Sequence, residues 1–216
     1  MNMKVSVIGT GRMGTGLVRN LHPVMSRLVW GSRNPAGAQQ LIEKYGFKGV
    51  EAAEIQTALQ ADIIFHALWF RDLIPWAESC RELLKGKILV DLVNPFTEDF
   101  SDFTMDWGTS AAEELQHKLP ETSVVGAFKN TFFQVLEKPV HQGTVSDVYV
   151  TSDDEKAKLA VIQLLQGIPF RIMDAGRLSN NRTIERMTLF ERELAIRYGH
   201  YPYVSYRIFG QGDEQA

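Results

Sequence analysis

The 216-residue sequence lacks the features that mark several classes of protein. Its one cysteine, Cys80, cannot form an internal disulfide, so we expect a reducing, cytoplasmic environment. No apolar run approaches the ~20 residues that cross a bilayer, and the N-terminus does not have the profile of a signal peptide. The formal net charge of −3 provides no basic field for nucleic acid. The five histidines are widely spaced, so we expect no metal site.

The composition that remains is ordinary for a globular protein, with 44% hydrophobic and 23% charged residues. Short apolar runs alternate with helix-compatible segments along the chain. This alternation predicts an α/β fold with a doubly wound, mostly parallel Rossmann sheet. After about residue 175 the pattern changes to one long helix and a terminal strand over 203–209, which we interpret as a small C-terminal extension.

Three glycines near the N-terminus have a spacing with a physical purpose. The segment KVSVIGTGRMGTG places Gly9, Gly11 and Gly14 as G-x-G-x-x-G after an apolar run. The first glycine allows a tight turn out of a strand, and the second lets the backbone approach a pyrophosphate. The third lets the following helix pack closely, with its N-terminal N–H groups facing the phosphates. The sequence therefore predicts dinucleotide binding here.

The expected second strand, within residues 27–35, ends in Ser32 and Arg33. An NAD-selective site usually has Asp or Glu at this position to bind the ribose 2′-hydroxyl. A hydroxyl and a guanidinium instead suit a 2′-phosphate. We therefore expect residues 1–175 to form an NADP-binding domain, with residues 176–216 packed on it. The alternative is that Arg33 is a solvated turn residue.

Further along, an apolar strand over 62–68 contains His66, which either packs in the core or takes part in catalysis. A helix is expected over 73–84. The acidic and aromatic segment 96–108 shows no periodicity, and we interpret it as an exposed loop that either covers a substrate or has no role. Ser110 and Glu113 have the spacing of a capping box, which predicts a helix start.

Four separated stretches resemble one family. They are GTGRMGTGLVRNL with WGSRNP, SAAEELQHKLPETSVVGAF, DAGRLSNNRTIE and YRIFG. Together they resemble the coenzyme F420-dependent NADP oxidoreductases, and they are similar to the soluble oxidoreductase domain of the STEAP metalloreductases. The resemblance implies NADP as cofactor, FMN, FAD or F420 as the second redox partner, and hydride transfer between NADPH and that flavin or deazaflavin. It also implies a homodimer.

The resemblance further implies which positions contact the ligands. The pyrophosphate is expected at the glycine motif, the 2′-phosphate at the end of the second strand, and the nicotinamide ribose after the strands at 62–68 and 87–93. In that order the residues are Gly9, Thr10, Gly11, Arg12, Met13 and Gly14, then Ser32 and Arg33, then Ala67, Leu68 and Trp69 with Asn94 and Pro95 nearby. The second redox ring is expected to face Lys129, Asn130 and Thr131.

At this last stretch the sequence departs from the family pattern. The deazaflavin enzymes have a His-Thr pair here and the metalloreductases an Asn-Thr pair, whereas this chain has Lys129-Asn130-Thr131. A lysine beside the ring would stabilise its anionic reduced form. Alternatively, Lys129 reaches solvent or pairs with a carboxylate. Asn130 and Thr131 either donate to the ring or cap the local turn, so the acceptor stays open.

No Ser-His-Asp, Cys-His or paired-carboxylate pattern is recognisable in the sequence, and we predict no classical catalytic residue. Hydride transfer between two bound rings needs little acid–base help from side chains. One alternative is an NADP-dependent reductase of a small carbonyl or imine, which would implicate Lys129 or His66. Another is an NADP-binding redox sensor without catalysis, with the loop from Phe96 to Trp107 as its contact surface.

Overall fold

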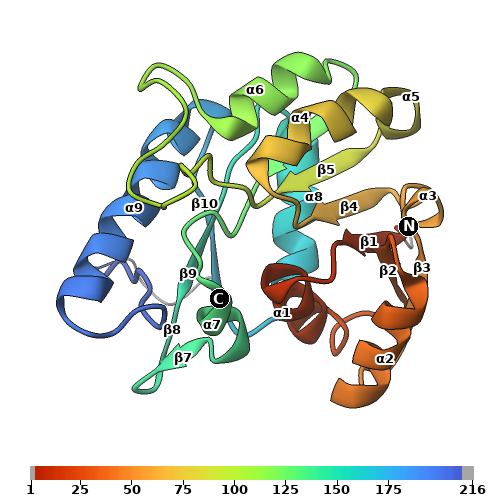
Figure 1. The fold of residues 1–216 in the computed structure, drawn as a ribbon, viewed down its shortest axis with the longest axis horizontal. Coiled ribbons are helices and arrows are strands. Elements are labelled where there is room, and N and C mark those ends of the chain that lie inside the picture. Colours follow the sequence, from red (N-terminus) through yellow and green to blue (C-terminus); the bar gives the residue numbers. More distant parts are fainter. Residues whose placement is uncertain (1–2, 211–216) are drawn as a thin grey trace.

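The structure is a computed structural model, and it describes residues 3–210. Its centre is a parallel six-stranded sheet with the strand order β3-β2-β1-β4-β5-β6 (Figure 1). The strands are β1 (Val5–Ile8), β2 (Leu28–Ser32), β3 (Val50–Glu54), β4 (Ile63–His66), β5 (Ile88–Asp91) and β6 (Ser123–Gly126). The predicted doubly wound Rossmann architecture is confirmed.

Helices cover both faces of the sheet, as Figure 1 shows. One face packs on α1 (Arg12–Leu21), α2 (Pro35–Tyr45), α7 (Phe133–Glu137) and α8 (Glu155–Leu165). The other packs on α3 (Ile55–Ala58), α4 (Phe70–Ser79), α5 (Arg81–Leu84) and α6 (Ala111–Lys118). No helix within residues 3–210 is long and apolar enough to cross a bilayer.

The alternation of side chains along each strand divides the core between these two layers. In β1, Val5 and Val7 join the core beneath α1, while Ile8 joins the core beneath α4. In β4, Phe65 faces the first layer and Ile64 the second. Both faces of the central strands are thus buried, which explains their nearly continuous apolar sequences.

A smaller parallel pair, β9 (Asp147–Val150) and β10 (Arg171–Asp174), follows the main sheet. An isolated antiparallel bridge between Gly126 and Thr151 links it to the end of β6. The sequence did not indicate the short hairpin of β7 (Val140–His141) and β8 (Thr144–Val145). A 3-10 turn, η1 (Leu178–Asn180), leads into α9 (Asn181–Arg197), which lies along one side of the molecule (Figure 1).

Two local expectations were wrong. The helix expected over 73–84 begins at Phe70 and is divided at Cys80, whose backbone leaves the helical region (φ −106°, ψ 7°). Residues 203–209 form no strand. They are held by single contacts to β9 and α9. The Asp147 N–H in β9 donates to the Tyr206 carbonyl, and the Tyr206 hydroxyl donates to the Met187 carbonyl in α9. Alternating side chains do not reveal whether a neighbouring strand is available for pairing.

Candidate active-site cleft

The glycine-rich turn after β1 has the geometry that its spacing predicts. Gly9 has φ +109°, a conformation that L side chains rarely adopt. A Cβ on Gly14 would lie 2.0 Å from the Gly9 carbonyl oxygen, so α1 approaches the turn too closely for any side chain. The Trp30 indole N–H also donates to that carbonyl, at 2.8 Å, and this fixes the turn against β2.

Gly11 differs from these two because it faces open space. A Cβ there would meet nothing within 4 Å, and no side chain caps the first turn of α1. The free N–H groups of a helix N-terminus attract anions. The turn therefore fits a pyrophosphate that approaches the backbone at Gly11.

The end of β2 carries the two residues expected at a 2′-phosphate. Ser32 is nearly buried, and its hydroxyl accepts a hydrogen bond from the Asn34 N–H at 3.0 Å. Arg33 is exposed and forms no hydrogen bond or ion pair with residues 3–210. Its guanidinium is therefore free to bind an anion. Contact with NADP at both residues stays a prediction.

A cleft of about 280 Å³ opens beside the turn, where the loops that follow β1, β4, β5 and β6 meet. Ligands of open parallel sheets bind at this edge. Its walls are formed by Gly11, Arg12 and Met13, by Ala67, Leu68, Trp69 and Phe70, by Leu92, Val93 and Asn94, by Phe96 and Phe100, by Thr131, Phe132 and Phe133, and by Thr188, Arg192 and Tyr201. Among the described residues, no Asp, Glu, His or Lys lines it.

Two buried oxygen atoms of the cleft lining have no hydrogen-bond partner among the described residues. They are the Asn94 Oδ1 and the Thr131 Oγ1. The Asn94 amide is held in place because its Nδ2 donates to the Lys129 carbonyl at 2.7 Å. Buried polar atoms are rarely left without partners, so these two atoms fit a polar ligand such as the nicotinamide carboxamide. Pro95, expected nearby, does not line the cleft; its carbonyl accepts from Thr104.

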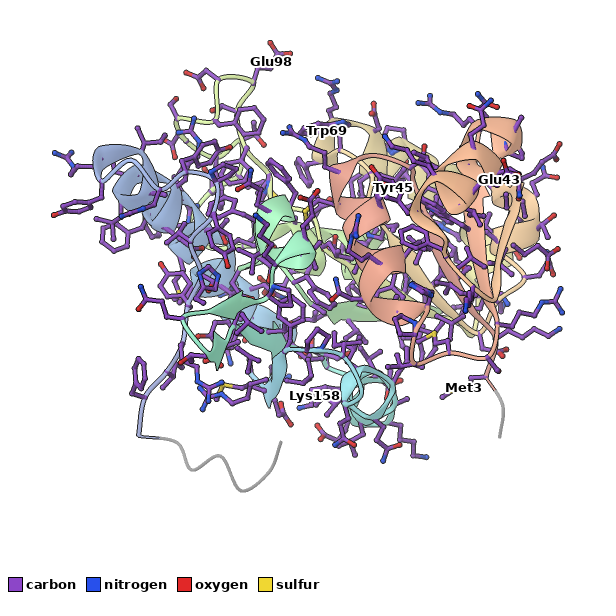
Figure 2. The ribbon with its side chains drawn as sticks, turned by 90° about the horizontal axis from the view of Figure 1, so that it is seen from below. Met3, Glu43, Tyr45, Trp69, Glu98 and Lys158 are labelled. Atoms are coloured by element: carbon purple, nitrogen blue, oxygen red, sulfur yellow. The ribbon has the colours of Figure 1, made fainter. Side chains whose placement is uncertain are left out.

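Aromatic side chains border the cleft on the side of the 96–108 loop. Trp69 is 57% exposed and makes an edge contact with Phe100 at 6.2 Å between ring centres. Phe100 also contacts Phe96, at 5.6 Å. Figure 2 shows Trp69 and Glu98 on the same side of the molecule, away from Met3 and Lys158. Part of this loop therefore contributes directly to the wall of the cleft.

Lys129 lies behind the wall of the cleft. It is 1% exposed, and its Nζ is 2.7 Å from an Asp91 oxygen and 2.9 Å from a Glu185 oxygen. Burial alone would lower the pKa of Lys129, but the two carboxylates outweigh it and raise that pKa above its usual value. Of the interpretations made from the sequence, the structure supports the pairing with carboxylates.

Asn130 and His66 also lie away from the cleft. The Asn130 amide donates to the Asp147 carbonyl at 2.8 Å and so ties the loop after β6 to β9. His66 is buried in β4, with its Nε2 3.2 Å from Asp91. Burial opposes the ionisation of Asp91, but Lys129 and His66 together hold its pKa well below the usual value. Thr131 is thus the one member of the expected Lys-Asn-Thr set that reaches the cleft.

Sequence reasoning missed the residues that α9 contributes. Glu185 accepts hydrogen bonds from the backbone N–H groups of Ala111 and Ala112 at the start of α6, where Ser110 also caps Glu113 as expected. Arg192 lines the cleft one turn beyond Thr188. The sequence did signal the Lys129 network, because an aspartate that ends an apolar strand needs a partner when it is buried.

Comparisons with known proteins show the family of the chain. A family model described as "NADP oxidoreductase coenzyme F420-dependent" matches residues 4–95. The F420-dependent NADP reductase of Methanocaldococcus jannaschii is 32% identical over 213 residues, which cover 91% of this chain and 94% of that protein. The chain belongs to the coenzyme F420-dependent NADP oxidoreductase family. The resemblance stated from the sequence is therefore confirmed, and this member of the family is an NADP-dependent oxidoreductase.

Two further similarities place the oxidoreductase among its relatives. Human metalloreductase STEAP2 is 30% identical over 186 residues, which cover 86% of this chain but 36% of that protein. A crystal structure of a putative F420-dependent NADP reductase from Arthrobacter shares the fold, with a TM-score of 0.79 and 24% identity. That similarity covers 91% of this chain and 95% of the other.

Proposed function

We propose that the protein transfers a hydride between NADP(H) and the ring of a deazaflavin of the F420 type, with a flavin such as FMN or FAD as the other acceptor to test. The family and the Methanocaldococcus relative support F420, and nothing specific supports a flavin. When bound, the nicotinamide and the second ring supply the redox chemistry, and the protein positions them and excludes water.

The observation that carries this proposal is the composition of the cleft. It joins an open phosphate cradle at Gly11 to walls that are mainly apolar and aromatic. We expect Asn94 and Thr131 to orient a nicotinamide through their buried oxygens, which have no partner among the described residues. Hydride transfer from ring to ring requires alignment and the exclusion of water more than a proton donor. This matches a lining to which residues 3–210 contribute no Asp, Glu, His or Lys.

A reductase of small carbonyls or imines would need a proton donor at the reacting atom. Tyr201 is the one phenol that lines the cleft. His66 and Lys129, which the alternative would implicate, are both buried away from the cleft. The arrangement thus favours transfer between rings, and Tyr201→Phe distinguishes the two chemistries.

The decisive experiment is anaerobic NADPH oxidation by the purified protein with F420, FMN, FAD and riboflavin, and separately with a ketone and an amine. Turnover with a ring acceptor that survives Tyr201→Phe would support the proposal. Turnover on the carbonyl or imine alone, abolished by Tyr201→Phe, would replace it with the alternative. Tight NADPH binding without turnover on any acceptor would favour the redox sensor.

A homodimer is part of this proposal. On the outer face of α9, Phe190, Leu194 and Tyr198 form an i, i+4, i+8 stripe, with Phe190 59% and Tyr198 69% exposed. Exposed apolar stripes of this kind mark protein interfaces. Sedimentation equilibrium should show a dimer that Phe190→Asp dissociates, and a wild-type monomer at all concentrations would contradict it.

A further inference from the structure

Arg192 presents an unneutralised positive charge to the cleft. Its side chain lines the cleft from α9, and its Nε is buried without a hydrogen-bond partner among the described residues. No carboxylate of residues 3–210 lies within 4.0 Å of its guanidinium. A partly buried guanidinium without a counter-ion is costly unless a ligand supplies one.

Aromatic rings hold this guanidinium in place without neutralising it. Its Cζ lies 5.8 Å from the centre of the Phe100 ring and 5.5 Å from that of Tyr201. Cation–π contacts of this length position an arginine and leave its N–H groups available. Arginines near the two ends of α9 differ from Arg192 in having carboxylate partners. Arg182 pairs with Glu113, and Arg197 pairs with Glu193.

The charge of the whole cleft also favours an anionic ligand. Of the residues that the structure describes, two arginines line it and no carboxylate does. Arg12 belongs to the glycine-rich turn, where its guanidinium stacks 4.1 Å from the centre of the Phe133 ring. Arg192 comes from α9 and contacts different rings, those of Phe100 and Tyr201. The cleft thus has a second cationic position apart from the pyrophosphate cradle.

We propose that Arg192 binds an anionic group, a phosphate or carboxylate, on the side chain of the electron acceptor. The inference rests on the proposed function and adds the class of acceptor to it. Arg192 then selects acceptors whose ring carries a negatively charged side chain over neutral acceptors with the same ring. Charge-assisted hydrogen bonds from a guanidinium to a phosphate are strong and directional.

The test compares ligands that differ only in this charge. FMN and riboflavin share one ring and differ by a phosphate, as do 5-deaza-FMN and 5-deazariboflavin. Equilibrium binding of all four to the NADP⁺-loaded protein, followed by fluorescence, gives a readout that does not depend on turnover. We expect the wild type to bind at least one phosphorylated ligand roughly 10- to 100-fold more tightly than its neutral partner, since hydrogen bonds to charged groups have about this effect.

In Arg192→Gln this preference should disappear, while binding of the neutral ligand and of NADP⁺ stays unchanged. Arg197→Gln is the matched control, because Arg197 lies on the same helix but is exposed and paired with Glu193. Equal weakening of charged and neutral ligands would overturn the inference, as would weaker NADP⁺ binding or a wild type without preference. Preference in binding without any NADPH oxidation would leave the inference standing and contradict the proposed function.

Discussion

Lys129 and Arg192 are two positive side chains near the same cleft, and they behave in opposite ways. Lys129 is buried with two carboxylates within 2.9 Å, whereas Arg192 faces the cleft without one from the described part of the chain. Lys129 occupies the position after β6 where a ring contact was predicted, but its charge is neutralised by Asp91 and Glu185. The difference shows that nearness to a site in sequence and access to its ligand are separate properties.

The matched charge of Lys129 nevertheless supports the cleft. Its Nζ joins β5, through Asp91, to α9, through Glu185, which in turn caps α6. Its carbonyl accepts hydrogen bonds from Asn94 and Thr188, two residues of the cleft lining. Lys129 is therefore a positioning residue, and its removal should act first on the fold.

The largest effect is expected from Lys129→Met. Removal of one member of a buried ionic cluster leaves the others uncompensated, which costs about 3–5 kcal/mol. The free energy of unfolding, measured with urea, should fall by this amount. In the double variant Lys129→Met/Glu185→Gln we expect part of the loss to be recovered, because one buried charge is removed.

Lys129→Met would break the comparison if it kept wild-type stability and lost only hydride transfer. Lys129 would then act on the ligands and not on the fold. Glu113→Gln provides a matched control, because it removes a part-exposed carboxylate of α6 that pairs with Arg182 of α9. Its cost should stay near 1 kcal/mol.

Much of the fold was predictable because each element had a local cause. The glycine spacing from Gly9 to Gly14 reflects contacts within one turn, and Ser110 caps α6 across three residues. The cofactor side of the cleft follows from these local signals together with the rule for parallel strand ends. The end of α2 at Gly46, in the left-handed region, was equally readable.

The other side of the cleft depends on contacts between distant segments. Glu185 meets Lys129 and the start of α6 across 56 and 74 residues of sequence, and no local pattern encodes that meeting. Arg192 differs from Arg197 only in the face of α9 on which it lies. The side chains on this side of the cleft are therefore decided by how α9 docks, which the pattern of a single sequence does not supply.

A second prediction concerns Glu191, which lies on the buried face of α9. Glu191 is 3% exposed, neither of its oxygens has a hydrogen-bond partner among the described residues, and burial raises its pKa to about 9. The folded protein therefore keeps a proton on Glu191 that the unfolded chain releases above its ordinary pKa of 4.5. Stability should fall as the pH rises from about 4.5 to 9.

Glu191→Gln removes this titration. Relative to the wild type, the variant should gain about 4 kcal/mol of stability as the pH rises from 5 to 8, an order of magnitude given by ~1.4 kcal/mol per pH unit for one proton. Urea unfolding at several pH values measures the difference. Parallel profiles for the two proteins would show that Glu191 is ionised in the folded state and has a partner.

A third prediction concerns Arg33, a cation that, like Arg192, is left without a partner in residues 3–210. Arg33→Ala should weaken NADPH binding by roughly 10- to 100-fold and leave NADH binding nearly unchanged, because the two cofactors differ only in the 2′-phosphate. Titration calorimetry with both cofactors measures this. Because the Arg33 side chain is exposed, the unfolding curve of the variant should match that of the wild type. Equal losses of NADPH and NADH affinity would mean that Arg33 acts on the conformation of the turn.

The smallest effect separates two threonines of the cleft. The Thr131 hydroxyl has no partner among the described residues, whereas the Thr188 hydroxyl donates to the Lys129 carbonyl at 2.6 Å. Val has nearly the same shape as Thr, so Thr131→Val should leave the free protein as stable as the wild type and weaken binding of NADP⁺ or of the acceptor by about 2- to 10-fold. Thr188→Val should instead lower stability by about 1–2 kcal/mol, because the Lys129 carbonyl loses a donor. If Thr131→Val lowered stability and left both ligands bound as before, its hydroxyl would have a partner inside the protein, and the comparison between paired and unpaired polar groups of the cleft would fail.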